Sequence, residues 1–381
     1  MTTTNSYQIC NKLVLDTSYP GISFDAAGVC NLYHDFYHNV KPHWHSGSEG
    51  RHQLEATVDA IRNSGKGRDF DCIMGLSGGA DSSYMLHVMV TEFGLRPLVF
   101  HVDGGWNSEI AVHNINGLID RLGLDLYTEV INWEEMRDFQ LAMFKSGVPH
   151  IDTPQDLAFI GVLYKFARKH GIKYILNGGN ISTECVPRPL DIIYWGTDMM
   201  QIRDILARFG TVSMRTYPFS SVFYHKFYLR YLRGIKVFKP LNYMPYVKQQ
   251  AMDTMQREYG WKPYPQKHFE SRFTRFFEGY WLPTRFAFDM RRVDLSSLIL
   301  TDQLSRDQAL QELERPPYDP ELIQQDFDYI ATKLGISSET LRGYLEMPLK
   351  SYRDYRNQHR IFELGEWVLS RLAGTRRGGA F

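Results

Sequence analysis

The sequence has no excess of charge of either sign. It contains 43 Lys and Arg residues and 43 Asp and Glu residues, so its formal net charge is zero. Proteins that bind a free polynucleotide usually carry a basic surface that attracts the phosphates. The balanced composition therefore argues against nucleic acid as a partner.

Signals for membranes, secretion and disulfides are also lacking. No run of about 18 apolar residues occurs, and the N-terminus, MTTTNSYQ, has no basic segment followed by an apolar one. The few cysteines are too widely spaced to suggest a disulfide framework: Cys10, Cys30, Cys72 and Cys185. These absences predict a soluble, cytoplasmic protein without stable membrane insertion.

Aromatic residues are abundant instead. They make up 14% of the 381 residues, which is typical of globular chains with binding clefts rather than of disordered chains. The length is sufficient for two or three domains. We therefore expect a folded protein with a sizeable core.

The most informative stretch is FDCIMGLSGGADSSYML, residues 70–86. Its first apolar run predicts a strand, and later apolar residues at helical spacing predict a helix over 83–93. Gly75, Gly78 and Gly79 permit a tight turn between them. The loop is thus placed at a helix N-terminus, where free N–H groups and the positive end of the helix dipole attract anions.

Strands and helices alternate after this loop. They are predicted at 98–102, 110–122, 126–131, 153–170 and 172–176. Short links from strand to helix to strand are typical of a parallel sheet, so the predicted fold class is α/β. Glycine-rich or acidic loops follow three of the strands, at the edge where open parallel sheets bind ligands.

The remaining segments give the domain organisation. We predict a small irregular N-terminal region (1–55), an α/β domain (56–245), a helical C-terminal region for substrate or partner binding (246–372) and a mobile tail (373–381). A helix at 53–64 precedes the first strand. The segment FYHKFYLRYLRG favours a half-buried helix beside the cleft, and stacking on bases or a membrane surface is the alternative.

The loop after the first strand offers several groups for a phosphate. They are the N–H groups of Gly78, Gly79 and Ala80, the hydroxyls of Ser77, Ser82 and Ser83, and the carboxylate of Asp81. Such donors suit a pyrophosphate, and a lone carboxylate among them suits a Mg²⁺ that bridges phosphate oxygens. The P-loop lysine and the Gly-x-Gly-x-x-Gly pattern are both absent. The alternative interpretation is a glycine turn that only joins strand to helix.

The segment Ser77-Gly-Gly-Ala-Asp-Ser82 resembles the Ser-Gly-Gly-x-Asp-Ser loop of the ATP pyrophosphatases, the PP-loop superfamily. These enzymes cleave ATP to AMP and pyrophosphate. The resemblance implies a Rossmann-like open sheet of the adenine nucleotide alpha-hydrolase type, and ATP and Mg²⁺ as cofactors. It also implies catalytic roles for Ser77 and Asp81, with Asp81 as a metal ligand.

Two further loops match this superfamily in order. Val102 and Asp103 follow the second strand, where the resemblance implies contacts with adenine and ribose. Gly178 and Glu184 lie in the segment GGNISTE, which resembles a loop of the NAD-synthetase type with a second metal-binding Glu. Glu184 is offset by one residue from that pattern.

A narrower resemblance covers nearly the whole chain. The segments VLDTSYPGISFDAAGVCN, FKPLNYMPY, RFTRFFEGYWLPTRFAFDMRRVDLSSLI, ERPPYDPEL and LEMPLKSYRDY resemble the N-acetyl sugar amidotransferases of the WbpG and PseA type. This implies conversion of an acetamido group to an acetamidino group, in lipopolysaccharide O-antigen or related glycan biosynthesis. The implied substrate is a nucleotide-linked or nonulosonic sugar, for instance a UDP-linked diacetamido uronic acid. Its amide oxygen would be adenylated, and ammonia would displace AMP.

Ammonia needs a source that this chain does not provide. A glutaminase requires a positioned Cys nucleophile with a His base, and Cys185 near the third loop is favoured as a buried structural residue. The resemblance implies separate partners, namely a glutaminase subunit and a cyclase-like subunit that channels ammonia.

The N-terminal region departs from the family pattern of two Cys-x-x-Cys pairs. Those positions hold Cys10, Leu13, Cys30 and Tyr33. Two thiolates cannot close a tetrahedral site, so no zinc is expected. His34 and His38 are the alternative ligands, and polar loop histidines are the favoured interpretation.

Several basic residues are further candidates. Lys239 and Lys248 either stabilise phosphate charge or lie at the surface. Three arginines either meet the acidic part of a sugar or pair with nearby carboxylates: Arg285, Arg291 and Arg292, with Asp289 and Asp294. A tRNA-modifying PP-loop ligase is the alternative function, and a non-catalytic nucleotide-binding scaffold is the third.

Overall fold

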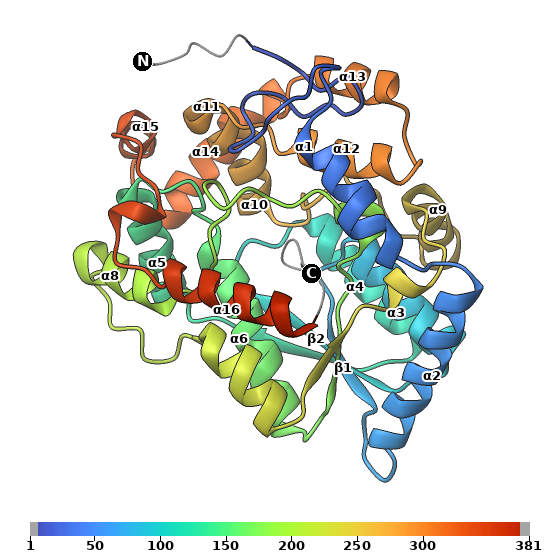
Figure 1. Cartoon of the computed structure of the whole chain (residues 1–381). Coiled ribbons are helices and arrows are strands. Elements are labelled where there is room, and N and C mark those ends of the chain that lie inside the picture. Colours follow the sequence, from blue (N-terminus) through green and yellow to red (C-terminus); the bar gives the residue numbers. More distant parts are fainter. Residues whose placement is uncertain (1–6, 374–381) are drawn as a thin grey trace.

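The structure of the chain is a computed structural model that describes residues 7–373, apart from the side chains at 226, 227, 366 and 368–373. The tail that the sequence predicts to be mobile lies outside the described residues from 374 onward. Figure 1 shows the N-terminal segment beside the C-terminal helices, at the end of the molecule opposite helix α2 (Ser48–Ser64).

Five parallel strands form one open sheet. They are β1 (Cys72–Gly75), β2 (Pro97–Asp103), β3 (Leu126–Val130), β4 (Tyr174–Leu176) and β5 (Lys236–Phe238). Their order across the sheet is β3-β2-β1-β4-β5, and every neighbouring pair is parallel. The α/β class with an open parallel sheet is therefore confirmed.

Helices make up most of the remainder. They are α1 (Asn31–Asp35), α2, α3 (Ala80–Thr91), α4 (Glu109–Leu122), α5 (Trp133–Ser146), α6 (Thr153–Lys169), α7 (Ile181–Glu184), α8 (Met199–Phe209), α9 (Lys248–Tyr259), α10 (Arg272–Phe276), α11 (Leu282–Phe286), α12 (Arg291–Leu300), α13 (Arg306–Glu314), α14 (Pro320–Leu334), α15 (Ser338–Glu346) and α16 (His359–Ala373). Shorter 3₁₀ and π-helical segments are η1 (Phe36–Val40), η2 (Lys41–His43), η3 (Phe223–Leu232), η4 (Pro240–Tyr243), η5 (Phe277–Trp281) and η6 (Tyr352–Asp354).

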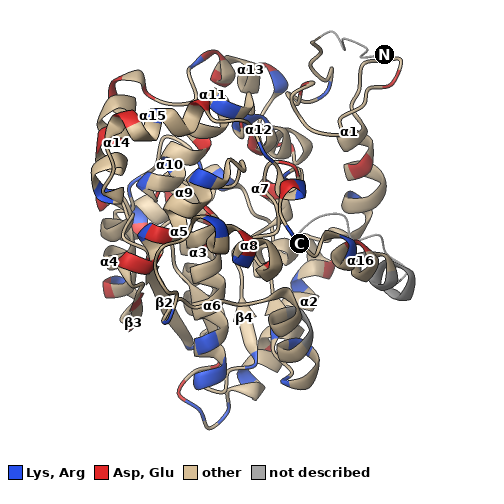
Figure 2. Ribbon diagram, turned by 90° about the vertical axis from the view of Figure 1, so that its left-hand side faces the viewer, with Lys and Arg blue, Asp and Glu red and all other residues tan. Residues whose placement is uncertain are grey.

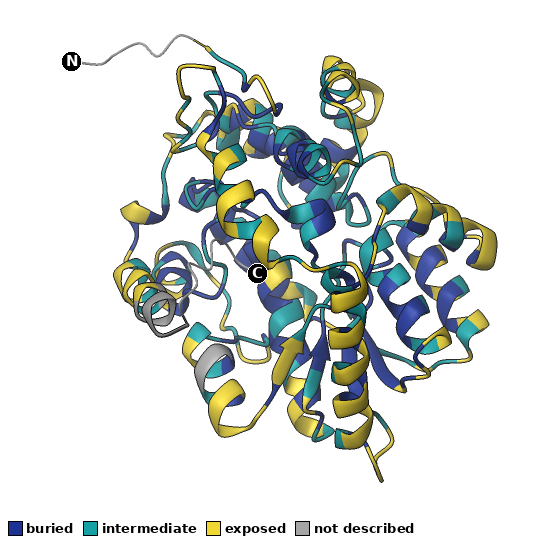
Figure 3. Ribbon diagram, turned by 45° about the vertical axis from the view of Figure 1, so that its right-hand side comes forward, coloured by how far each residue is buried: buried dark blue, intermediate teal, exposed yellow. Residues whose placement is uncertain are grey.

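The two faces of the sheet belong to two separate hydrophobic cores. Side chains alternate along a strand, so Met74 and Val99 join a core with α2, α3, α4 and α9, whereas Ile73 and Phe100 join a core with α5, α6 and the C-terminal helices. Figure 1 shows α6 on one side of β1 and β2 and α3 and α4 on the other. Strands β1 and β2 are mostly buried, whereas the edge strand β5 is mostly exposed, and Figure 3 shows dark and yellow strands accordingly.

The second core crosses both predicted domain boundaries. It includes Cys10 and Leu13 of the N-terminal region, Phe100 of the sheet, and Trp281 and Phe327 of the C-terminal region, all at most 2% exposed. The boundary at residue 55 also falls inside α2. The N-terminal and C-terminal regions thus pack directly on the α/β layer, and the division into parts remains a proposal.

The elements differ from the predicted ones in several places. Helix α2 begins at Ser48 rather than at residue 53, α3 begins at Ala80 rather than at residue 83, and α5 has no predicted counterpart. The segment FYHKFYLRYLRG forms η3, with His225 and Leu229 buried and Phe223 exposed. A helix with one buried face, as favoured from the sequence, is what the structure contains.

The N-terminal region holds its two cysteines together. The N–H of Cys30 donates to Sγ of Cys10 at 3.2 Å, and both residues are buried. His34 instead pairs with Asp25 at 2.9 Å, and His38 Nδ1 lies 2.7 Å from the His34 carbonyl. Both histidines thus have partners outside the cysteine pair.

The apolar residues of the described helices and the charged residues of the surface both bear on membrane contact. Within residues 7–373, no helix is both long and apolar enough to cross a membrane. Acidic and basic segments are interspersed over the side of the molecule shown in Figure 2.

Gly161 and Gly343 offer a matched test of packing on the second core. An added Cβ at Gly161, on α6, would overlap the carbonyl of Pro218, whereas Gly343, on α15, has open space around it. We expect Gly161→Ala to lower the free energy of unfolding by about 1–3 kcal/mol through overpacking. Gly343→Ala should raise it by up to about 1 kcal/mol because alanine favours the helix. Urea unfolding of both variants measures this, and equal midpoints would contradict the packing described for α6.

Candidate active site

The sheet reverses its order between β1 and β4. The chain runs outward from β1 to β2 and β3, then returns to the other side of β1 for β4 and β5. Such a reversal leaves a crevice at the carboxyl ends of the two central strands, because their loops turn to opposite faces. A cavity of about 350 Å³ lies there. It is lined by the loops after β1 and β4 and by residues between 261 and 270.

Gly78 fixes the shape of the loop after β1. Its φ is +83°, and an added Cβ would lie 2.9 Å from the carbonyl oxygen of Ala111. Both features require glycine. Its own carbonyl accepts from Trp261 Nε1 at 3.0 Å and from the Tyr264 hydroxyl at 3.3 Å. Residues far along the chain therefore hold this loop open toward the cavity.

The hydroxyls of the loop divide into two groups. Ser77 and Ser82 line the cavity with their Oγ atoms 3.3 Å apart, and the N–H of Gly79 donates to Ser77 Oγ at 3.2 Å. Ser83 is fully buried, and its Oγ has no partner among the described residues. Ser83 follows Ser82 on α3 and is turned by about 100° around the helix axis, so it faces the core rather than the cavity.

Glu270 is a cavity residue that the sequence does not indicate. Its Oε1 lies 3.3 Å from Ser77 Oγ, and it would lie 2.9 Å from a Cβ added at Gly79. Its backbone carbonyl also accepts from Ser108 N–H. No local pattern marks this residue, because 193 positions separate it from Ser77.

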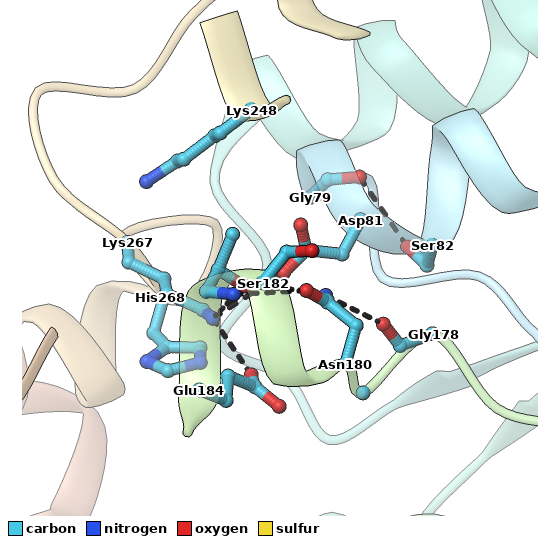
Figure 4. Close-up of polar contacts among 12 residues, drawn as sticks. Gly79, Asp81, Ser82, Gly178, Asn180, Ser182, Glu184, Lys248, Lys267 and His268 are labelled. Atoms are coloured by element: carbon cyan, nitrogen blue, oxygen red, sulfur yellow. Dashed lines mark hydrogen bonds and ion pairs between the residues drawn. The ribbon is translucent and has the colours of Figure 1, made fainter. Parts of the chain in front are cut away.

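Asp81 and Glu184 come together from the two central loops. Both contact the ammonium of Lys267, at 3.3 Å from Asp81 Oδ2 and 2.7 Å from Glu184 Oε1. The other oxygen of Asp81 accepts a hydrogen bond from Tyr246. Figure 4 shows Lys267 and Lys248 reaching toward these loops from the same side. The site therefore contains a carboxylate pair with one positive charge between its members.

The electrostatics of this group favour its charged forms. Burial opposes ionisation of Glu184, but the positive charges of Lys267, Arg188 and His268 outweigh it and lower the pKa of Glu184 to about 2. Burial likewise opposes the charge of Lys267, but Glu184 and Asp81 raise its pKa above the ordinary value. Glu184 and Lys267 are thus both charged at neutral pH.

The donor set fits ATP with Mg²⁺. Loop N–H groups and serine hydroxyls suit phosphate oxygens, and Mg²⁺ in nucleotide sites is usually held by one or two carboxylates plus phosphates and waters. Asp81 and Glu184 supply that pair. Within residues 7–373, no group of three or more His, Cys, Asp or Glu residues is arranged to hold a metal without a nucleotide.

The loop after β4 brings Gly178 and Gly179 to the cavity. A Cβ at Gly178 would lie 3.2 Å from the Ser82 nitrogen, so the two central loops touch at this glycine. A Cβ at Gly179 would lie 3.5 Å from Lys239 Nζ, which places this lysine beside the loop. Lys248 lines the cavity directly.

Other predicted residues lie away from this cavity. Asp103 accepts from the Gly105 N–H at 2.8 Å and from Asn107 Nδ2 at 3.3 Å, and neither it nor Val102 lines the cavity. Burial raises the pKa of Cys185 to about 12, which leaves a protonated thiol. The adenine and ribose contacts at Val102 and Asp103 therefore stay a prediction.

The three candidate arginines are engaged elsewhere. Arg285 donates to the carbonyls of Leu345 and Met347, at 2.6 and 2.7 Å. Arg291 pairs with Asp289 at 2.7 Å, and Arg292 pairs with Asp16 at 3.0 Å. Arg291 thus pairs with Asp289, as in the second interpretation from the sequence, whereas Arg285 and Arg292 have partners that the sequence did not indicate.

Further charged residues lie at and near the cavity. His268, at the cavity wall with a φ of +65°, pairs with Glu278 at 3.2 Å, and Arg188 lies 3.6 Å from the same carboxylate. Burial opposes the charge on His268, but Glu278 outweighs it and raises the pKa of the imidazole. His150, which is buried, pairs at 3.2 Å with Asp156, whose side chain is exposed.

Asp152 lies near His150, and the side-chain hydrogen bonds that it accepts come from neutral groups. It is 4% exposed and accepts hydrogen bonds from the hydroxyl of Thr274, at 2.6 Å, and from Gln155. Burial, together with the negative charge of Asp156, raises the pKa of Asp152 to about 7.

Comparison with a family model identifies the C-terminal region. Residues 270–369 match the model described as the C-terminal domain of WbpG-like proteins of lipopolysaccharide biosynthesis. This region is thus similar to that domain, and the corresponding part of the sequence resemblance is confirmed. No curated protein matches the chain.

Several solved structures are similar to the chain at low identity. NMN synthetase from Francisella tularensis is 14% identical, over 88% of this chain and 98% of that chain, with a TM-score of 0.33. The NH3-dependent NAD synthetase from Campylobacter jejuni is 12% identical, over 79% and 98%, with a TM-score of 0.32. The U34-tRNA thiolase NcsA from Methanococcus maripaludis is 12% identical, over 78% and 81%, with a TM-score of 0.31. Because these scores are low, the fold assignment rests on the strand order and the two helical layers.

Asp152→Asn is expected to remove a pH dependence of stability. The folded carboxyl titrates at about 7 and the unfolded one at 3.8, so the folded state binds this proton more tightly. The stabilisation of the folded state by this bound proton is complete below about pH 4 and is lost as the pH rises through about 7. Between about pH 5 and pH 8, the wild type should lose roughly 1–3 kcal/mol more free energy of unfolding than the variant.

Urea unfolding at the two pH values measures this difference. Asp120→Asn, at an exposed position on α4, is the matched control and should retain the wild-type pH dependence. Equal losses in wild type and Asp152→Asn would show that Asp152 is ionised in the folded protein at both pH values.

Proposed function

We propose that this protein is an AMP-forming, ATP-dependent amidotransferase that converts an acetamido group of a sugar to an acetamidino group. The observation that carries the proposal is the constellation at the sheet reversal, where a glycine loop at a helix N-terminus, two carboxylates and Lys267 line one cavity. The WbpG-like C-terminal domain supports a role in lipopolysaccharide or related glycan biosynthesis. A UDP-linked diacetamido uronic acid is the substrate class that we favour.

The reaction consists of two displacements. In the first, the acetamido oxygen bonds to the α-phosphorus of ATP, and the bond from that phosphorus to the bridging oxygen breaks, which releases pyrophosphate. In the second, the nitrogen of ammonia bonds to the acetamido carbon, and AMP leaves with the oxygen. The amide oxygen is a poor leaving group, so adenylation is what makes the second step feasible.

The residues of the loops are assigned roles by their chemistry. The N–H groups of Gly79 and Ala80 and the hydroxyls of Ser77 and Ser82 are the donors for the departing pyrophosphate. Asp81 and Glu184 would hold Mg²⁺, which supplies neutralisation of phosphate charge when bound. Tyr246 orients Asp81 through its hydrogen bond. Lys239 and Lys248 bring positive charge to the phosphates from the edge of the cavity.

Exchange of labelled pyrophosphate into ATP tests this function. We expect exchange that depends on an acetamido sugar nucleotide, because only the acceptor oxygen can release pyrophosphate reversibly. Asp81→Asn should lower the exchange rate roughly a hundredfold or more, since it removes one metal-binding charge, and it should stay folded because an amide still accepts from Tyr246. Asp253→Asn, on the exposed face of α9, should exchange like the wild type.

The acceptor requirement separates the alternatives. Exchange that requires RNA instead of a sugar would establish a tRNA-modifying ligase, and no exchange with either would establish a nucleotide-binding scaffold. Full exchange by Asp81→Asn would reduce the loop to a turn that joins strand and helix.

We further propose that ammonia comes from a separate glutaminase subunit through a cyclase-like channelling subunit. The isolated chain should form the acetamidino product with ammonium salts but not with glutamine, and addition of both subunits should restore glutamine dependence. Cys185→Ala should leave glutamine-dependent turnover unchanged, because a buried thiol with a pKa of about 12 is not a nucleophile. Product formation by the isolated chain with glutamine would contradict the proposal that a separate subunit releases the ammonia.

A further inference from the structure

Lys267 lies between the two carboxylates that are expected to bind Mg²⁺. Its ammonium contacts Glu184 Oε1 at 2.7 Å, Thr183 Oγ1 at 3.2 Å and Asp81 Oδ2 at 3.3 Å. The Lys267 side chain is only 10% exposed. The three contacts of this ammonium are thus with groups of the loops after β1 and β4. Figure 4 shows the Lys267 side chain reaching toward these loops.

Lys267 contacts one oxygen of each carboxylate. The other oxygen of Asp81 accepts from the Tyr246 hydroxyl, and the other oxygen of Glu184 lies beside Gly179. Because the ammonium lies 2.7 Å from Glu184 Oε1 and 3.3 Å from Asp81 Oδ2, it occupies a point from which one cation can contact both loops. A divalent cation that bridges the two loops there would compete with Lys267 for these oxygens.

Charge makes the two occupants mutually exclusive. One ammonium leaves the carboxylate pair with a net charge of −1, and a dication beside that ammonium would be repelled by several kcal/mol even at an effective dielectric constant of about 20. The phosphates of a nucleotide change this balance, because they provide new partners for the ammonium. The flexible four-carbon side chain of lysine allows the ammonium to move from the carboxylates to the phosphates.

We propose that Lys267 occupies the position of the divalent cation in the nucleotide-free protein and moves to the phosphates when nucleotide binds. This proposal rests on the proposed ATP-dependent function and adds a positioning role for Lys267, which lies in the segment between α9 and α10. It makes metal binding and nucleotide binding mutually dependent. Since such coupling is reciprocal, the free protein binds the metal weakly and the metal strengthens nucleotide binding.

Titration with Mn²⁺, followed by the electron paramagnetic resonance signal of the free ion, tests this. In the wild type, α,β-methylene-ATP should raise the affinity for Mn²⁺ at least about tenfold. Lys267→Met should bind Mn²⁺ about tenfold or more tightly than the wild type without nucleotide. Nucleotide should strengthen Mn²⁺ binding by a smaller factor in this variant than in the wild type, because only the contribution of the phosphates remains. Affinity of the variant for the analogue should fall, because its phosphates lose a cationic partner.

Lys248→Met is the matched control. It removes the same charge from the same cavity, but Lys248 contacts neither carboxylate among the described residues. Its Mn²⁺ affinity without nucleotide should stay within about threefold of the wild type. Lys267→Gln keeps a hydrogen-bond donor for the carboxylates and replaces Lys267→Met if circular dichroism shows that the latter is unfolded.

Two outcomes would overturn the proposal. The first is unchanged Mn²⁺ affinity of the nucleotide-free Lys267 variant, and the second is Mn²⁺ binding by the wild type that nucleotide does not strengthen. Failure of the enzymatic function is distinguishable from both. Tighter Mn²⁺ binding by Lys267→Met, without pyrophosphate exchange in the wild type, would retain the role of the lysine and reject the acceptor chemistry.

Discussion

The parallel pairing of β1 with β4 is the constraint on which the candidate site depends. Ile73 and Met74 align with Ile175 and Leu176, so the two loops that follow these strands begin at the same level of the sheet. About a hundred residues separate them in sequence, and only this register brings Asp81 and Glu184 to a common cation. A shift by two residues along the strand would move one loop by about 6–7 Å and separate the carboxylates.

The C-terminal part of the chain completes the site rather than only covering it. Lys267 and Glu270 precede α10, and the bridge between Asn107 and Ser271 fixes this segment to the loop after β2. The continuous core explains how such a segment is held in place, because the C-terminal helices pack on the same layer as Phe100. The candidate site therefore cannot be assigned to the α/β layer alone.

Local sequence patterns were sufficient to predict the features of the fold that are determined by residues close together in the sequence. The strand, the turn at Gly78 and the helix after it follow from spacing and glycine content, and the alternation of strands with helices was sufficient for the fold class. Lys267 and Glu270 were not predictable in this way, since long-range packing places them. The sequence did not show that Ser83 faces the core, because this depends on where α3 begins. It also did not show that Asp103 accepts hydrogen bonds from Gly105 and Asn107.

One ion-pair group satisfies two opposing requirements. Folding brings two carboxylates together in a partly buried cavity, and without a cation their repulsion and desolvation would destabilise the closed arrangement. A fixed cation would solve that problem and block the metal. On the proposed function, Lys267 pairs with the carboxylates before nucleotide binds and then contacts phosphate, so the ion pairs that stabilise the folded site would also be the ones that nucleotide binding breaks.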